Sequence, residues 1–199
     1  MNVDADFTNV EQQALLQQIA SGNENALRQA YHHFYKKLLQ FAFVLTKNKQ
    51  AAEELVEDVF IKFWKNRQNA TSVRNLKVYL YRATKNTCLN YLSSKANENI
   101  TKPFDAINID LTDSVCPDQL LIYQETYAKI KRVIETLPPR CKMIFKLIRE
   151  DGLKYKEAAE ILNLSPKTID AQMTIAIRRI AFQMREEFHK LPENKKNKS

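Results

Sequence analysis

The chain has 199 residues, of which 44% are hydrophobic, so it is long enough for one ordinary domain or two small ones with buried cores. Only two residues are glycine, which excludes glycine-rich phosphate-binding loops and argues against a hairpin-rich β fold. A net charge of +8 suits a polyanionic partner, either nucleic acid or an anionic membrane surface, although the same charge also serves solubility alone.

The N-terminal part of the chain is predicted to be helical. Thr8 and Glu11 form a capping-box pattern, and Asn48 and Ser72 are of the residue types that cap helices. Apolar residues recur at helical spacing between these points, most regularly after Asn48. Together these signals predict four helices, over residues 8–21, 23–46, 48–67 and 72–94.

Residues 96–117 are predicted to form a flexible linker between two domains. The segment is rich in Asn, Asp, Ser and Thr, which favour turns, and it lacks helical periodicity. Net charge changes at the same place, because residues 67–95 carry +6, 96–126 carry −5 and 127–199 carry +8. An acidic connector between two basic regions favours two separate nucleic-acid contacts.

The C-terminal part is also predicted to be helical. Pro138-Pro139 separates two helices, and Asp151-Gly152 ends the second of them. The predicted helices span residues 118–136, 140–150, 154–162 and 166–187, followed by a disordered tail over 188–199. The expected architecture is therefore all-α, with two small helical domains at residues 8–95 and 118–187.

A helix-turn-helix motif is predicted between Tyr155 and Arg179. Ala158 and Ala159 allow two helices to cross closely, and Ser165-Pro166 is a strong helix start. In DNA-binding proteins of this type the second helix enters the major groove. The outward face of that helix carries Lys167, Thr168, Ala171, Thr174, Ile175 and Arg178. A plain helical corner within a bundle is the alternative.

The fourth predicted helix carries a basic and aromatic stripe. A helical wheel places Arg74, Lys77, Tyr81, Arg82 and Lys85 on one side, opposite Leu76, Tyr79, Leu80, Ala83, Thr87 and Asn90. Cations that meet phosphates and rings that stack on bases suit single-stranded or distorted DNA. The alternative is a solvated basic face with a tyrosine at the edge of the core.

The third predicted helix carries an acidic outer face, formed by Glu53, Glu54, Glu57 and Asp58 beside Ile61 and Trp64. Such a surface repels DNA and attracts a protein partner with basic residues. Acidic residues early in a helix also interact favourably with its dipole, and a lone tryptophan is often a core residue. Both interpretations remain open at this point.

No catalytic, metal or cofactor site is predicted. Cys88, Cys116 and Cys141 are widely spaced and lack zinc-ligand spacing, so we expect reduced thiols in a cytoplasmic protein. The histidines show no metalloprotease spacing, and no nucleophile-elbow motif is present. No apolar run approaches the length of a membrane span, and the first residues do not resemble a signal peptide.

In their order along the chain, the acidic helix, the basic and aromatic helix and the helix-turn-helix resemble the sigma-70 family, in its extracytoplasmic-function (ECF) group. AAEELVEDVFIKFWKNR resembles the region 2.2 helix, NLKVYLYRATKNTCLNYLSSK resembles regions 2.3 and 2.4, and IETLPPRCKMIFKLIREDGLKYKEAAEILNLSPKTIDAQM resembles region 4. The match covers residues 10–95 and 118–187. The Asn- and Lys-rich style further resembles members from Bacteroidetes, where a membrane-tethered anti-sigma factor is the usual regulator.

The resemblance implies partners and roles. Core RNA polymerase would bind Glu53, Glu54, Glu57, Asp58, Ile61 and Trp64. The −10 region of the promoter would contact Asn66, Arg67, Arg74, Lys77, Tyr81, Arg82, Lys85 and Asn86, where residues 66–74 match the loop that holds a flipped base. The −35 element would contact Lys167, Thr168, Asp170, Ala171, Thr174 and Arg178.

The predicted reading helix departs from the family pattern. Asp170, Gln172, Ile175 and Ile177 occupy positions where many members carry basic residues. An aspartate cannot neutralise phosphate, but it can accept a hydrogen bond from cytosine N4. We therefore expect weak −35 affinity and an unusual −35 motif.

The sequence predicts a sigma factor that directs polymerase to promoters and binds no small-molecule substrate. One alternative is a helix-turn-helix regulator that binds duplex DNA on its own and recruits polymerase. A second is an adaptor whose basic helices bind proteins or RNA. An enzyme is the least favoured alternative.

Overall fold

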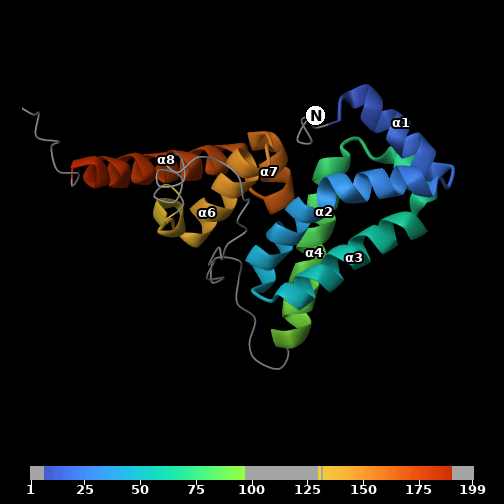
Figure 1. The fold of residues 1–199 in the computed structure, drawn as a ribbon, viewed down its shortest axis with the longest axis horizontal. Coiled ribbons are helices and arrows are strands. Elements are labelled where there is room, and N and C mark those ends of the chain that lie inside the picture. The colour runs from blue at the N-terminus through green and yellow to red at the C-terminus, as the bar shows by residue number, and fades with distance from the viewer. Residues whose placement is uncertain (1–6, 97–129, 131, 190–199) are drawn as a thin grey trace, which may run out of the picture.

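The computed structural model describes residues 7–96, 130 and 132–189, and all regular structure in these ranges is helical. The predicted linker, beyond Ala96, lies outside the described residues, as do most of the predicted helix over 118–136 and the tail beyond His189. Two groups of helices lie side by side, one from each end of the chain (Figure 1). The all-α prediction is confirmed.

The N-terminal domain is a four-helix arrangement in which α2, α3 and α4 pack against one another, with α1 across one end (Figure 1). The helices are α1 (Asn9–Ala20), α2 (Glu24–Thr46), α3 (Lys49–Lys65) and α4 (Leu76–Ala96). Their apolar stripes meet in a core that includes Phe34, Leu38, Phe41, Val56 and Leu80, each at most 3% exposed. Burial of these stripes supplies the main driving force for the domain.

Side-chain caps start the first three helices where the sequence predicts. Thr8 and Glu11 form the reciprocal capping box, with Glu11 Oε2 accepting from the Thr8 backbone N–H at 2.8 Å. Asn48 Oδ1 accepts from Ala51 N at 3.0 Å and starts α3. Each cap satisfies backbone donors that have no partner within their own helix.

The predicted start of the fourth helix is wrong. Ser72 lies in a 3₁₀ helix, η1 (Arg67–Ser72), and its hydroxyl donates to Asn69 O at 2.7 Å. The cap of α4 is Asn75, whose Oδ1 accepts from Val78 N at 3.0 Å. Gln12 of α1 holds this junction by donating to Arg74 O and accepting from Leu76 N, at 3.0 and 2.9 Å.

The C-terminal domain contains α6 (Pro139–Phe145), η3 (Lys146–Glu150), α7 (Tyr155–Leu162) and α8 (Pro166–His189). The sequence predicts one α-helix over 140–150, but its last turn is π-helical, with Asp151 N bonded to Lys146 O at 3.0 Å. Gly152, at φ +68°, then reverses the chain. α8 extends away from the N-terminal domain (Figure 1).

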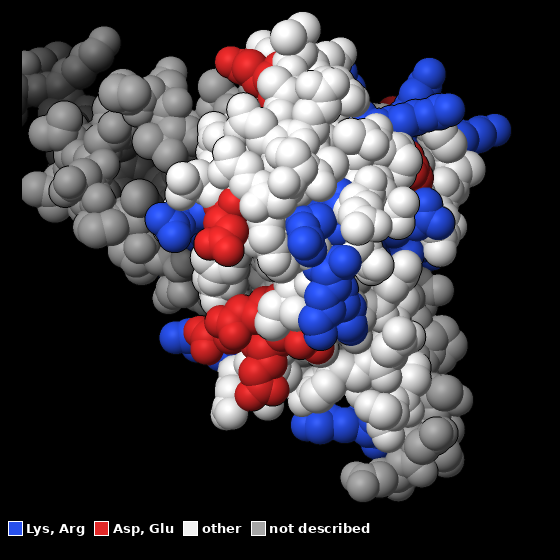
Figure 2. All heavy atoms as spheres, turned by 90° about the vertical axis from the view of Figure 1, so that its right-hand side faces the viewer, with Lys and Arg blue, Asp and Glu red and all other residues white. Residues whose placement is uncertain are grey.

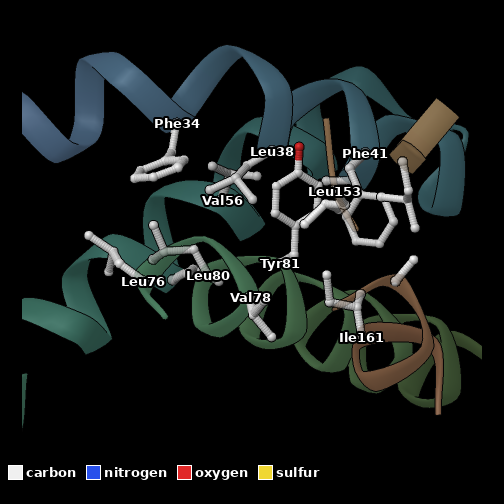
Figure 3. Packing of buried hydrophobic residues seen from close by; sticks show 14 of the residues in the cluster. Phe34, Leu38, Phe41, Val56, Leu76, Val78, Leu80, Tyr81, Leu153 and Ile161 are labelled. Carbon is white, nitrogen blue, oxygen red and sulfur yellow. The ribbon is translucent and has the colours of Figure 1, made fainter. Parts of the chain in front are cut away.

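The two domains share one apolar core. Leu153 and Ile161 of the C-terminal domain are at most 3% exposed and belong to the same buried cluster as Phe41 and Tyr81 of the N-terminal domain. Figure 3 shows Leu153 beside Phe41 and Tyr81, with Ile161 close to α4. The helices α4 and α7 therefore pack directly against each other.

Candidate nucleic-acid interface

The predicted helix-turn-helix is present and is formed by α7 and α8. Asn163, at φ +55°, ends α7, and Leu164 N bonds back to Ala159 O at 2.9 Å. Ser165 Oγ accepts from Thr168 N at 3.0 Å and caps α8. Ala158, Ile169, Met173 and Ala176 are at most 1% exposed and form the inner face of the motif. Small residues at the crossing let the two helices approach closely.

The outward face of α8 is accessible along its first three turns. Six residues predicted to contact the −35 element lie on this face: Lys167, Thr168, Asp170, Ala171, Thr174 and Arg178. Five are exposed and Thr168 is partly buried, since its hydroxyl lies 2.8 Å from Ser165 Oγ. The geometry therefore presents a helix whose N-terminal turns are open to a major groove.

The same helix carries apolar side chains on its surface. Ile175, Ile177 and Phe182 are 39%, 44% and 66% exposed. Ile175 and Ile177 occupy positions where many members of the family that the sequence resembles carry basic residues. The cations that remain exposed around them are Arg178, Arg179 and Arg185.

Three of the five members of the predicted basic and aromatic stripe are buried. Lys77, Tyr81 and Lys85 are 7%, 0% and 4% exposed, whereas only Arg74 and Arg82 are exposed. Tyr79, which the helical wheel places on the opposite side, is 37% exposed, and its ring packs on Phe63 at 5.4 Å between centroids. The helical wheel assigns the faces by periodicity and does not include the second domain, which covers the basic side.

The buried face of α4 lies under the C-terminal domain. Lys77 Nζ lies 3.7 Å from the position that a Cβ on Gly152 would occupy. Lys85 Nζ lies 3.3 Å from the side-chain oxygen of Asn163, in the amide orientation that satisfies both neighbours of that side chain. Burial, followed by the nearby Arg82 guanidinium, lowers the pKa of Lys85 below its ordinary value.

The segment before α4 is more accessible. Asn66 and Arg74 are exposed, Arg67 is partly buried, and on α4 itself Asn86 is exposed. The Arg67 guanidinium lies 4.7 Å from the centre of the Trp64 ring and donates to Trp64 O at 3.2 Å. This cation–π contact fixes the end of α3 against η1. The segment predicted to hold a flipped base thus contains the 3₁₀ helix η1, and the contacts between Arg67 and Trp64 hold its first residues against α3.

The acidic outer face of α3 is present as predicted. Glu54, Glu57, Asp58 and Ile61 are exposed, whereas Glu53 and Trp64 are partly buried. Lys49–Glu53 and Lys62–Asp58 form loose ion pairs at 3.9 Å within the helix. Seen from the right-hand side of Figure 1, the domain shows acidic side chains gathered next to basic ones (Figure 2). A partner of opposite charge can bind without displacing strong internal contacts.

Sequence reasoning missed the residues that join α4 to α7. Asn75 Nδ2 donates to Glu157 Oε1 at 2.9 Å, and Arg82 Nη1 lies 3.7 Å from Glu160 Oε1. The available signal was that Glu157 and Glu160 are three residues apart, hence on one face of α7. Asn75 was also a good capping residue directly before an apolar helix.

Within the described part of the chain, no group of three or more His, Cys, Asp or Glu side chains has a geometry for a metal ion. No described helix combines the length and the apolar character needed to cross a membrane. The cysteines Cys88 and Cys141 are buried thiols.

Two family models match the chain, one over each domain. The model described as "Sigma-70 region 2" matches residues 30–98, and the one described as "Sigma-70, region 4" matches residues 127–180. The first covers α3 and α4, and the second covers the helix-turn-helix.

Curated relatives cover most of the chain. The ECF RNA polymerase sigma-E factor of Escherichia coli K12 is 23% identical over 168 residues, which span 81% of this chain and 87% of that protein. The factor of the same name from Haemophilus influenzae is 26% identical over 171 residues, which span 81% and 88% of the two chains.

Two solved structures share the fold. CnrH, in complex with the cytosolic domain of CnrY, superposes with a TM-score of 0.55 and 17% identity, covering 88% of this chain and 97% of that one. The sigma factor RpoE from Bartonella quintana, in complex with the anti-sigma factor NepR, gives 0.56 and 21%, covering 79% and 96%.

Proposed function

The chain belongs to the ECF group of the sigma-70 family, and we propose that its three charged helical faces divide the work of promoter recognition. As a sigma factor it binds core RNA polymerase and directs initiation at promoters, while the polymerase supplies the chemistry. In the proposal, α3 binds polymerase, α4 with the preceding turn contacts the −10 region, and α8 contacts the −35 element.

The observation that carries the proposal is the open outer face of α8 behind a correctly capped helix-turn-helix. Lys167 and Arg178 are exposed one to three turns into the helix, where phosphates flank the major groove. Asp170, exposed between them, is a candidate acceptor for cytosine N4. The resulting −35 contact has few cations, so its affinity depends on the second contact made by α4.

Polymerase binding is proposed for the outer face of α3. Exposed carboxylates at Glu54, Glu57 and Asp58 precede the half-exposed Ile61 on the same face of α3. An apolar side chain within a charged rim is a common form of protein interface. This surface repels DNA, which separates the polymerase contact from the two DNA contacts.

We also propose that the chain is regulated by an anti-sigma factor, because CnrH and RpoE, which share its fold, were solved with CnrY and with the anti-sigma factor NepR. The Asn- and Lys-rich composition favours a Bacteroidetes-like member, whose regulator would be tethered to the membrane. A purified cytosolic segment of such a regulator should form a one-to-one complex with the chain and prevent its binding to polymerase.

Run-off transcription tests the proposal. Purified core polymerase is supplied with fragments of the source genome, with and without the chain, and transcript starts are mapped. Discrete starts that share upstream motifs are expected only with the chain. If no specific start appears while the chain alone binds duplex DNA tightly, the helix-turn-helix regulator replaces the sigma assignment.

A further inference from the structure

The outward face of α8 contains few of the side chains that usually read bases through hydrogen bonds. Between Lys167 and Arg178, which are about three helical turns apart, the sequence has no lysine or arginine. Arginine and lysine are the usual readers of guanine, whereas asparagine and glutamine are the usual readers of adenine. The middle of this face therefore has no cation with which to recognise guanine.

Gln172, the one amide side chain in this stretch, is engaged inside the domain. It is partly buried, and its Oε1 accepts a hydrogen bond from Cys141 Sγ at 2.8 Å. Cys141 is 2% exposed and packs with Ala176 on the inner side of α8. A bidentate contact to adenine uses both the oxygen and the nitrogen of the amide, so Gln172 cannot make it while it is bound to Cys141.

The threonine hydroxyls of the same face are also engaged within the protein. Thr174 Oγ1 donates to Asp170 O at 3.0 Å, and Thr168 Oγ1 lies 2.8 Å from Ser165 Oγ. A hydroxyl has a single proton, so Thr174 can accept a hydrogen bond from a base but cannot donate one while it is bonded to Asp170. The other group that Thr174 brings to the surface is a methyl.

Side chains that bear methyl groups occupy the centre of the face. Thr174 and Ile175 follow Ala171 by three and four residues, so the three side chains adjoin on the helix surface. All three are exposed, and Ile175 has 39% of its surface accessible. In the major groove thymine presents an apolar C5-methyl group, with which alanine and threonine methyls make apolar contact. Such a contact is favourable because both surfaces lose water.

We propose that α8 selects its −35 element mainly through thymine methyl groups, which contact Ala171, Thr174 and Ile175, while Lys167 and Arg178 bind phosphates at the two ends of the face. This inference rests on the proposed −35 role of α8 and specifies how that role is performed. It adds Ile175 to the residues that read DNA. It requires thymines, on either strand, at the centre of the −35 element.

Exchange of thymine for deoxyuridine tests the inference, because deoxyuridine lacks the C5-methyl and keeps the same hydrogen-bonding groups. Promoters are first identified by run-off transcription with core polymerase and the full chain. Duplexes of one such promoter are then synthesised with deoxyuridine at every −35 thymine, or at the same number of thymines in the spacer. The −35 exchange should weaken binding of the polymerase complex roughly threefold to fivefold for each contacted methyl, and the spacer exchange should leave binding unchanged.

Two isoleucines on α8 provide a matched pair of variants. Ile175 and Ile177 are 39% and 44% exposed, but two positions along a helix differ by roughly 200° in direction, so Ile177 faces away from the proposed contact. Ile175→Ala should reduce the preference for the thymine duplex over the deoxyuridine duplex by roughly threefold, because one methyl loses its partner. Ile177→Ala should keep the preference of the native chain.

The outcomes separate the inference from the proposed function. If the polymerase complex starts at no specific promoter, the sigma assignment fails. If Arg178→Ala binds both duplexes as tightly as the native chain, α8 does not contact the promoter and its −35 role fails.

Methyl readout is overturned, and the sigma assignment stands, if the promoters lack −35 thymines or if the deoxyuridine duplex binds as tightly as the thymine duplex. A third result would also overturn it. If Ile175→Ala weakens binding to core polymerase without DNA and leaves the preference for thymine unchanged, the exposed apolar side chain contacts protein rather than a base.

Discussion

A buried ion pair in the C-terminal domain allows a quantitative prediction. Lys146 Nζ lies 2.9 Å from Asp151 Oδ1, and the two side chains are 3% and 2% exposed. Removing one partner of a buried pair costs about 3–5 kcal/mol, because the remaining charge has lost its compensation. In Asp151→Asn, the carboxylate of Glu150 at 3.6 Å and the amide oxygen of Gln40 at 3.4 Å still face the ammonium group.

We therefore expect Asp151→Asn to lower the free energy of unfolding by about 2–3 kcal/mol. This is less than the cost of leaving the Lys146 ammonium group with no compensating partner at all. The second carboxylate oxygen, Asp151 Oδ2, is buried without a hydrogen-bond partner. An amide NH₂ placed there would also be unsatisfied, which prevents the substitution from being neutral. Equilibrium urea unfolding of the full chain, followed by far-UV circular dichroism, measures the change.

Two further variants identify the cause. Glu150→Gln removes a carboxylate that pairs with the same lysine but is 46% exposed, so it should cost at most about 0.5–1 kcal/mol. Lys146→Met with Asp151→Leu removes both charges together and should remain within about 1–2 kcal/mol of the native chain. Equal losses in Asp151→Asn and Glu150→Gln would refute the argument from burial.

Three other predictions concern the surfaces and the pH dependence. Arg178→Ala should weaken promoter binding by the polymerase complex and reduce the slope of log K against log salt by about 1, whereas Lys36→Ala, exposed on α2, should not. Glu57→Lys should weaken core polymerase binding roughly tenfold in a low-salt titration, and a loss no larger than that of Glu24→Lys would contradict the α3 assignment. Burial, with smaller effects of Tyr35 and Glu57, raises the pKa of Tyr31 from 10.0 to about 12, so the folded state favours the neutral phenol. That contribution to stability is complete below pH 10 and is lost as the pH rises toward 12, and Tyr31→Phe should flatten the stability curve in this window.

Local structure was largely predictable because its determinants are close in sequence. Thr8, Asn48 and Ser165 each cap a helix at the predicted place, since a capping bond joins residues two or three positions apart. The start of the fourth helix was predicted wrongly at Ser72 because local capping signals alone cannot choose between two candidate caps. Two suitable capping residues lie within four positions, and the choice of Asn75 depends on Gln12, which contacts the junction from a distant helix.

The faces of helices were predictable only where a single domain determines them. The inner face of α8 follows from periodicity because α6 and α7, the helices that it packs against, belong to the same domain and are close in the chain. The basic face of α4 does not, because α7 lies more than fifty residues later. Periodicity assigns Lys77 and Lys85 to a polar side, but contacts distant in the chain determine whether that side meets water, DNA or another domain.

The surface of the C-terminal domain that packs on the basic face of α4 contains both polar and apolar groups. A face that carries several cations is costly to bury unless oxygen acceptors replace its water. The C-terminal domain supplies such acceptors at Glu157, Glu160 and Asn163, together with the apolar side chains of Leu153 and Ile161.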